Sequence, residues 1–433
     1  MTVETNTVQK SSRSLLYAIV VIGVAFLATT LAQPQVLARI PIQNMLKNEL
    51  HVGRSANAAF FFWIGFFWYL KPFLGIISDA FPLFGTRRRS YMIAGGVLAT
   101  LAWVAVYFTP HQYNKLLLVG IVLDLFMVVA STAAGGYMVE AAQAHSGSGS
   151  LSSARNLVEQ FCVVVTGPAG GFLASIAFGF TTLACGGVMF LIVPATVWFL
   201  HEPEIRINSR ELLGCAGQQL RNIFTAKTMW AASGFMALFY FAPGFGTAIF
   251  YKQQDELHMT TQGQGFLYFL SGLFGMIAAA LYGSYACRRW NLRTLLFASL
   301  LAGTVANFGY LFYSSVTRAR IIDSVNGLGY TLAEVAMMDL AVRATPKGSE
   351  ALGFSIMLSV RNLTLFGSDW VGSKLLDSFH WQFNNLVIAN GATTFIAVLL
   401  VFALPKMIVR AKDAEPQQSH AQLVTASAES AHD

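Results

Sequence analysis

Apolar runs of about twenty residues recur along nearly the whole chain, separated by short polar segments. A helix needs a run of about this length to cross the hydrocarbon core of a bilayer. Only 11% of the residues are charged, whereas a typical soluble domain has about 25%. Most of the chain therefore cannot face water, and the pattern predicts an all-α membrane protein.

The apolar runs predict twelve transmembrane helices in two halves of six, because the longest internal polar stretch, 202–227, follows the sixth run. We expect this stretch to be a cytoplasmic linker between bundles at 13–201 and 228–410. The polar ends 1–12 and 411–433 are predicted to be disordered tails, since polar segments bury too little apolar surface to fold. The predicted spans are 14–40, 55–79, 90–109, 113–141, 151–177, 180–201, 228–251, 262–287, 292–314, 317–344, 350–376 and 382–405.

Lys and Arg are more than twice as frequent in the segments on the N-terminal side of the predicted membrane as on the other side. Because positively charged loops stay in the cytoplasm, both termini are predicted to be cytoplasmic, in a multi-pass protein of the inner (cytoplasmic) membrane. The same distribution accounts for the net charge of +7, so no nucleic-acid partner is expected. The lipid bilayer is the expected surrounding, and we expect a monomer.

Acidic residues repeat at one spacing in the two halves. Asp124 and Glu140 lie sixteen residues apart in the fourth predicted span, and Asp323 and Asp339 lie sixteen apart in the tenth. Transporters are often built from two related halves. The repeat therefore predicts a duplicated six-helix bundle.

The segment 71–89, KPFLGIISDAFPLFGTRRR, resembles the signature of the folate–biopterin transporters, a branch of the major facilitator superfamily. A glycine, an aspartate four residues on and then arginines form the cytoplasmic loop motif of that superfamily. The Lys-Pro start and the Phe-Pro-x-Phe-Gly insert are similar to the longer form of the family. The stretches 239–257 and 345–350 also resemble it. The resemblance covers most of 41–405 and implies the major facilitator fold and a folate, biopterin or related pterin substrate.

The same motif implies a cytoplasmic latch. In the superfamily an arginine of the loop bridges to an acid at the cytoplasmic end of span four, and this network must break before the carrier opens inward. The alternative is a solvated loop whose arginines only set the orientation in the membrane. The residues expected in the latch are Lys71, Gly75, Asp79, Arg87, Arg88, Arg89, Glu140 and Asp339.

Arg361 is the deepest cation in the predicted spans. It follows Glu350 by eleven residues, about 16 Å at a rise of about 1.5 Å per residue, which is near the middle of a core about 30 Å thick. A charge at that depth normally faces a cavity, and a guanidinium suits a carboxylate or another planar anion. The alternative is an internal salt bridge to Asp369, Glu334 or Glu159.

Aromatic residues are dense on the second predicted span, and a flat pteridine ring stacks well on such faces. So many aromatic side chains cannot all line one cavity, and most must face lipid or neighbouring helices. The candidates for contact with substrate are Trp63 and Trp68, together with Tyr240 on the seventh span.

Three acids within spans are candidates for proton coupling, because burial favours the uncharged form of a carboxyl group. They are Asp124, Asp323 and Glu334. Asp124 and Asp323 could equally be half-solvated residues at the external mouth.

Together these features predict a secondary active transporter that works by alternating access and is driven by protons. No Walker A sequence is present, so direct use of ATP is not expected. The alternative is a carrier of the same fold for another organic anion, such as a peptidoglycan fragment or a drug-like compound. An enzyme, a metal site and a cofactor are not expected, since no HExxH or GxSxG motif occurs and the eight histidines lie mostly in loops or tails.

Overall fold

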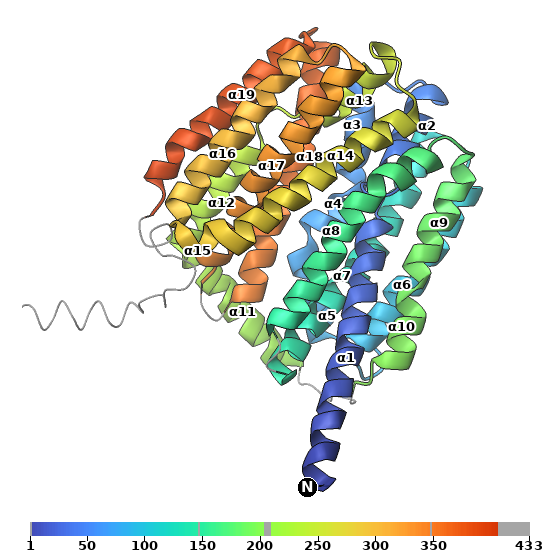
Figure 1. The fold of residues 1–433 in the computed structure, drawn as a ribbon. Helices are drawn as coiled ribbons and strands as arrows, with labels where there is room; N and C mark the ends of the chain where they lie inside the picture. Colours follow the sequence, from blue (N-terminus) through green and yellow to red (C-terminus); the bar gives the residue numbers. More distant parts are fainter. Residues whose placement is uncertain (1, 146–147, 203–208, 347–348, 406–433) are drawn as a thin grey trace, which may run out of the picture.

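The computed structural model describes residues 2–145, 148–202, 209–346 and 349–405, with only the backbone described for some residues inside helices, among them 2–15. The described chain forms α-helices that pack into two bundles (Figure 1). In Figure 1 the blue and green helices of the N-terminal half lie on the right, and most yellow and red helices of the C-terminal half lie on the left. The predicted tail 411–433 lies outside the described residues.

Helices of the N-terminal half follow the predicted apolar runs, and several are broken within one run. They are α1 (Thr2–Leu31), α2 (Arg39–Asn48), α3 (Arg54–Ile64), α4 (Phe66–Tyr69), α5 (Lys71–Ala80), α6 (Arg89–Phe108), α7 (Tyr113–His145), α8 (Ser148–Leu173), α9 (Phe178–Phe190) and α10 (Ile192–Phe199).

The predicted linker contains the helix α11 (Ser209–Thr225), which lies at the lower end of Figure 1. The C-terminal half then repeats the pattern of long helices and internal breaks. Its elements are α12 (Lys227–Tyr240), α13 (Gly246–Asp255), α14 (Thr261–Leu281), η1 (Tyr282–Ala286), α15 (Cys287–Arg289), α16 (Leu292–Phe308), η2 (Gly309–Phe312), α17 (Val316–Ala344), α18 (Glu350–Ser378), α19 (Phe383–Leu400) and η3 (Val401–Ala403).

Six helical segments of the described part of the chain are long and apolar enough to cross a membrane. α17 and α18 are not among these segments, and the predicted second and seventh spans are broken into shorter helices. The number of twelve spans and the cytoplasmic termini therefore stay predictions. The six segments are Arg89–Phe108, Tyr113–Met138, Phe178–Phe199, Thr261–Ala286, Leu292–Phe312 and Phe383–Ala403.

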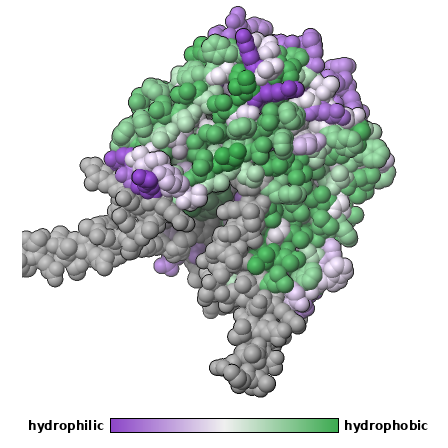
Figure 2. Space-filling view, viewed as in Figure 1, coloured by the Kyte–Doolittle hydropathy of each residue, from purple (hydrophilic) through white to green (hydrophobic). Residues whose placement is uncertain are grey.

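Large apolar side chains are exposed on the outside of both bundles, among them Phe172, Phe180, Val305 and Phe402. Figure 2 shows hydrophobic residues over most of the visible face, with hydrophilic residues gathered at the upper end, where α2 and α13 lie in Figure 1. Soluble monomers rarely expose apolar patches of this size. Contact with lipid explains the surface, because acyl chains are as apolar as these side chains.

Glycines bring the two bundles into backbone contact where α8 meets α14. A Cβ atom on Gly167 would lie 2.4 Å from the carbonyl oxygen of Gly265, and one on Gly265 would lie 2.3 Å from that of Gly167. Gly171 approaches the carbonyl oxygen of Thr261 in the same way, at 2.8 Å. Small residues are typical of such close helix crossings in membranes, and here they set the distance between the halves.

The first helix of each half is broken. The break between α1 and α2 contains Pro34, and the break between α12 and α13 contains Pro243 and Gly244. Proline has no N–H and disrupts a helix, and backbone groups freed at membrane depth are tolerated where they line a cavity or are buried in protein. Two such breaks at corresponding positions of the halves therefore point to the binding site.

Candidate functional site

Two adjoining cavities lie at these breaks. The C-terminal cavity, of about 390 Å³, is lined by the α12–α13 break and by α14 and α16 to α19. The central cavity, of about 380 Å³, lies between the halves and is lined by the α1–α2 break, α8, α14, α17 and α18. Arg39, Tyr268, Ser271 and Tyr330 line both. Each volume lies within the range of small-molecule sites, about 300–1,000 Å³.

Arg361 lines the central cavity and is held by two groups of the C-terminal half. Its Nη2 lies 2.6 Å from Oε1 of Glu334, and its guanidinium carbon lies 5.2 Å from the centre of the Tyr240 ring. The Tyr240 hydroxyl donates to Oε2 of Glu334 at 2.8 Å. The Nε of Arg361 is buried and has no hydrogen-bond partner. The ion pair with Glu334 is thus present, and one donor of the guanidinium remains for a ligand.

Arg39 was not a candidate from the sequence, because it falls near the end of the predicted first span. The helix breaks before it at Pro34, and Arg39 begins α2 on the wall of both cavities. Its Nη2 lies 4.0 Å from Oδ2 of Asp369, its guanidinium lies 5.8 Å from the centre of the Phe61 ring, and its Nε is buried without a partner. A proline occurs in the first predicted span of each half, and this sequence feature could have identified the break and Arg39 after it.

Gln35 lies in the same break, on the wall of the central cavity. Its side chain is buried, with 8% of the residue exposed, and neither the nitrogen nor the oxygen of its amide has a hydrogen-bond partner. Buried polar groups are almost always paired. The free amide of Gln35 is therefore a second group available to a ligand that the sequence analysis did not identify.

Asp323 lines the C-terminal cavity and is 7% exposed. The Tyr310 hydroxyl donates to its Oδ1 at 2.6 Å, and the Tyr313 hydroxyl donates to its Oδ2 at 2.8 Å. An ionised carboxylate has about four acceptor positions. Each oxygen of Asp323 therefore keeps capacity for a further donor.

Three asparagines cross the C-terminal half beside Asp323. Asn326 donates to Asn307 at 2.7 Å, Asn307 donates to Asn390 at 3.0 Å, and Asn390 donates to the carbonyl of Pro243 at 3.0 Å. All three side chains line the C-terminal cavity. The chain of amides pairs a carbonyl at the α12–α13 break, so it supports the irregular backbone at membrane depth.

Asp124, the counterpart of Asp323 in the first half, is fully buried and lines neither cavity. The indole N–H of Trp68 donates to its Oδ1 at 2.8 Å. The Lys71 ammonium lies 4.7 Å from the centre of the Trp68 ring and donates to the Ser131 hydroxyl at 3.0 Å. These contacts connect three predicted site residues inside the first half, Asp124, Trp68 and Lys71, away from a ligand in either cavity.

The aromatic candidates are separated by the fold. Trp63 is 42% exposed, and its ring centre lies 6.3 Å from that of Trp370. Neither Trp63 nor Trp68 lines one of the two cavities, whereas Tyr240 lines the C-terminal cavity. Of these three side chains, Tyr240 is the one placed to contact a ligand there.

Solved transporter structures share this fold. A D-xylose–proton symporter matches with a TM-score of 0.65 and 14% identity, over 90% of this chain and 97% of the other. A POT family transporter solved with 5-aminolevulinic acid matches with a TM-score of 0.68 and 12% identity, over 92% and 96%. At such low identity the likeness shows the fold alone, and it confirms the all-helical major facilitator architecture.

The model of the BT1 family matches residues 34–423. The chain belongs to the BT1 family. Curated relatives include a folate-biopterin transporter of Synechocystis sp., 26% identical over 87% of this chain and 80% of the relative, and folate transporter 1 of Plasmodium falciparum, 21% identical over 90% and 80%. Family, relatives and fold together confirm the prediction of a membrane transporter that is not an enzyme.

In this BT1-family protein the expected latch pairs Arg88 with Glu140. Both Nε and Nη2 of Arg88 lie 3.0 Å from Oε1 of Glu140, and the Arg88 side chain is 7% exposed. In the second half Asp339 accepts from Tyr282 at 3.1 Å and from Nε of Arg343 at 2.7 Å. The repeated acids at the ends of α7 and α17 thus each bind an arginine of their own half.

Glu202 is a member of this region that the sequence analysis missed. Its carboxylate accepts hydrogen bonds from the backbone N–H groups of Arg87 at 3.0 Å, Arg88 at 3.0 Å and Arg89 at 2.9 Å. These groups lie at the N-terminus of α6, where a carboxylate is favoured. An acid directly after the sixth apolar run was the available signal. The side chain of Asp79 lies outside the described residues.

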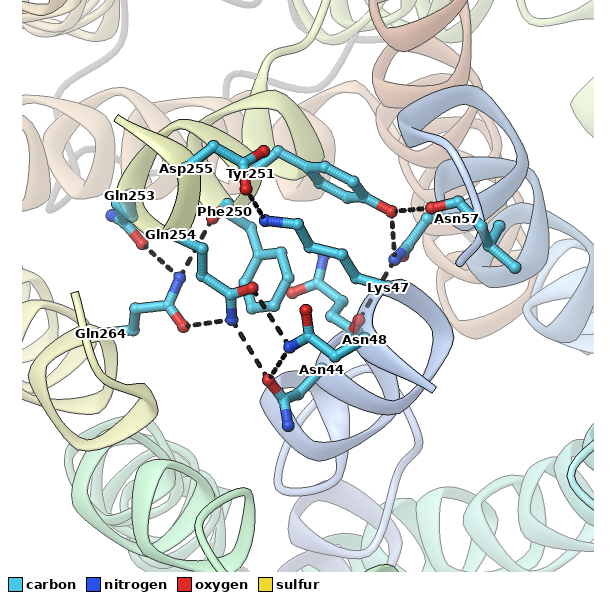
Figure 3. A network of polar contacts seen from close by, with 12 residues as sticks. Asn44, Lys47, Asn48, Asn57, Phe250, Tyr251, Gln253, Gln254, Asp255 and Gln264 are labelled. Atoms are coloured by element: carbon cyan, nitrogen blue, oxygen red, sulfur yellow. Dashed lines mark hydrogen bonds and ion pairs between the residues drawn. The ribbon is translucent and has the colours of Figure 1, made fainter. Parts of the chain in front are cut away.

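A polar network joins the two halves of the BT1-family protein at the end that carries α2 and α13 (Figure 3). Lys47 Nζ lies 2.5 Å from Oδ1 of Asp255. The amide nitrogen of Gln254 donates to Asn44 at 3.2 Å and to Gln264 at 3.3 Å. The bonds of Lys47 with Asp255 and of Gln254 with Asn44 cross from one half to the other, so they hold the halves together at this end. No residue of the network was predicted from the sequence.

Proposed function

We propose that this transporter carries folate or a related pterin across the inner membrane by alternating access, in symport with protons. One observation carries the proposal: a cavity between the halves is lined by two guanidinium groups, Arg39 and Arg361, and by the unpaired amide of Gln35. Folate has a flat pteridine ring and a glutamate tail with two carboxylates, and arginine is well suited to carboxylates. The relatives named as folate transporters support the same substrate class.

Alternating access requires the halves to separate at one end while they meet at the other. The network of Lys47 and Asp255 closes the end that we assign to the outside. The pair of Arg88 and Glu140 belongs to the opposite end, with both termini in the cytoplasm. Breaking the outer network and rearranging the inner latch would open the central cavity to each side in turn. We expect a monomer to do this.

Glu334 is the acid that best connects a proton to the substrate. It lines the central cavity and neutralises Arg361 at 2.6 Å. Protonation of Glu334 would release the guanidinium for a substrate carboxylate, so proton and substrate would enter together. Asp323 and Asp124 are further candidates for the proton path, and Asp124 is the more remote because it lines neither cavity.

Uptake of labelled folate into vesicles that contain the purified full chain tests the proposal. We expect an imposed proton gradient to drive uptake, an uncoupler to abolish it, and Arg361→Ala to reduce it at least tenfold. Arg318→Ala is the matched control, because Arg318 is exposed on α17 and lines neither cavity. If neither the uncoupler nor Arg361→Ala changes the rate of uptake, this mechanism is ruled out.

A second candidate is a carrier for a different organic anion, such as a peptidoglycan fragment. The cations Arg39 and Arg361 favour an anion without specifying a pteridine. Thermal stabilisation of the purified protein by folate, biopterin and a muropeptide separates the two functions. Stabilisation by the muropeptide, with no effect of either pterin, would favour this second function.

A further inference from the structure

We propose that the two cavities recognise two parts of one substrate: the pterin ring enters the C-terminal cavity with its amidine edge on Asp323, and the acidic tail lies in the central cavity. Arg39 stands at the junction, because it lines both. This inference rests on the proposed function, and it states which residues recognise which end of the substrate.

The charges of the cavity walls differ in sign. The C-terminal cavity is lined by the acids Asp323 and Asp369 and by one cation, Arg39. The central cavity is lined by the cations Arg39 and Arg361 and by one acid, Glu334. A substrate with a row of N–H donors at one end and carboxylates at the other is therefore oriented by the walls, with its donors in the C-terminal cavity.

Asp369 is already committed within the protein. Its Oδ1 accepts from the backbone N–H of Thr247 at 2.9 Å, and its Oδ2 accepts from the Thr247 hydroxyl at 2.7 Å. It thereby caps the first turn of α13, which begins at Gly246. Asp369 also lies 4.0 Å from Nη2 of Arg39. Asp323 forms no ion pair with the described residues, so we assign the ligand to Asp323.

Asp323 has the geometry that a pterin requires. Each of its oxygens accepts one tyrosine hydroxyl, from Tyr310 or Tyr313, and these two bonds fix the carboxylate. A pterin presents a ring N–H and an amino N–H side by side, so the two donors can meet the two oxygens as a guanidinium does. Phe245 and Tyr310, packed edge to face at 5.1 Å, line the same cavity and offer apolar surface to a flat ring.

The tail meets groups that lack partners in the structure. Both polar atoms of the Gln35 amide and the Nε atoms of Arg39 and Arg361 are buried without hydrogen bonds. The tail of folate contains an amide followed by two carboxylates. Its amide can pair with Gln35, and its carboxylates can accept from the two guanidinium groups. A bound tail would thus remove the cost of leaving these groups unpaired.

Binding of three probes to the purified full chain, measured by calorimetry, tests the assignment. The probes are folate, biopterin as the ring without the tail, and p-aminobenzoyl-glutamate as the tail without the ring. Asp323→Asn exchanges one acceptor for a donor, so we expect at least tenfold weaker binding of folate and biopterin and unchanged binding of the tail probe. Gln35→Leu removes the amide of a side chain that lines only the central cavity, so it should do the reverse, weakening folate and the tail probe at least tenfold and sparing biopterin.

If the Asp323→Asn protein does not fold, a second variant tests the same cavity by steric hindrance. Ala242 is buried and lines the C-terminal cavity, so Ala242→Val should weaken folate and biopterin without changing any charge. Equal losses for all three probes in each variant would overturn the two-part assignment while leaving the proposed function intact. Absence of binding of all three probes to the unmodified protein would instead overturn the proposed function.

Discussion

Arg361 and Glu334 form an ion pair between α18 and α17, with Nη2 and Oε1 2.6 Å apart and both side chains about one-fifth exposed, at 20% and 21%. The pair lines the cavity between the halves, and Tyr240 binds both members. Removing one partner of a buried pair leaves an uncompensated charge. Single and double variants of this pair can therefore distinguish a role in stability from a role in substrate binding.

The first prediction therefore concerns the single and double variants of this pair. Arg361→Ala and Glu334→Ala should each lower stability by about 1–3 kcal/mol and reduce uptake at least tenfold, since each leaves a partly buried charge without its partner. The double variant should regain most of the stability and remain inactive, because the ligand for the substrate carboxylate is lost. Thermal melting and folate uptake measure the two effects. Recovery of uptake in the double variant would show that the pair is structural only.

A second prediction concerns the outer network. Lys47→Glu would place a second negative charge beside Asp255 on the other half. Repulsion between the two carboxylates should shift the protein toward opening at that end. An exposed pair contributes up to about 1 kcal/mol, so we expect a rise of about fivefold at most in the labelling rate of a cysteine at Leu267. This residue is 2% exposed and lines the C-terminal cavity.

The control for this experiment is the exchanged pair, Lys47→Glu with Asp255→Lys, in a background without the native cysteines. The exchange restores opposite charges and should return labelling by an impermeant thiol reagent to its original rate. Labelling that stays fast in the exchanged pair would contradict the proposed role of the network.

A third prediction follows from the contact between α8 and α14. Gly265→Ala would place a Cβ atom 2.3 Å from the carbonyl oxygen of Gly167, and forcing a side chain into a packed contact costs about 1–3 kcal/mol. We expect lower thermal stability and slower uptake. Gly187→Ala on α9 is the control, since no atom lies within 4 Å of its added Cβ. Similar behaviour of the two variants would argue against glycine contact between the halves.

A fourth prediction concerns the N-terminus of α6. Glu202→Gln keeps the shape of the side chain and removes the charge that binds three backbone N–H groups. Loss of a helix cap costs about 0.5–2 kcal/mol, so we expect faster hydrogen exchange at residues 87–89 and a modest loss of stability. Glu256→Gln, at an exposed site, is the control. If hydrogen exchange at residues 87–89 is unchanged in Glu202→Gln, Glu202 does not cap α6.

The sequence alone located the residues whose chemistry is unusual for their place in a membrane. Arg361 and Glu334 stand out because a charge inside an apolar run is costly, and both line the central cavity. Asp323 was found in the same way. Arg39 and Gln35 were missed, because near the end of an apolar run a polar residue looks solvated, and only the break at Pro34 puts them on the cavity wall.

Burial in lipid depends on hydrophobicity summed over about twenty neighbouring residues, and this is why the sequence by itself determined a helical membrane protein, its apolar runs and its repeated acids. Pairing depends on distances between residues far apart in the chain. The tertiary structure alone decided that Trp68 donates to Asp124, that Lys47 meets Asp255 across the two halves, and that Glu202 caps α6. No local pattern encodes these contacts, because each depends on the packing of several helices at once.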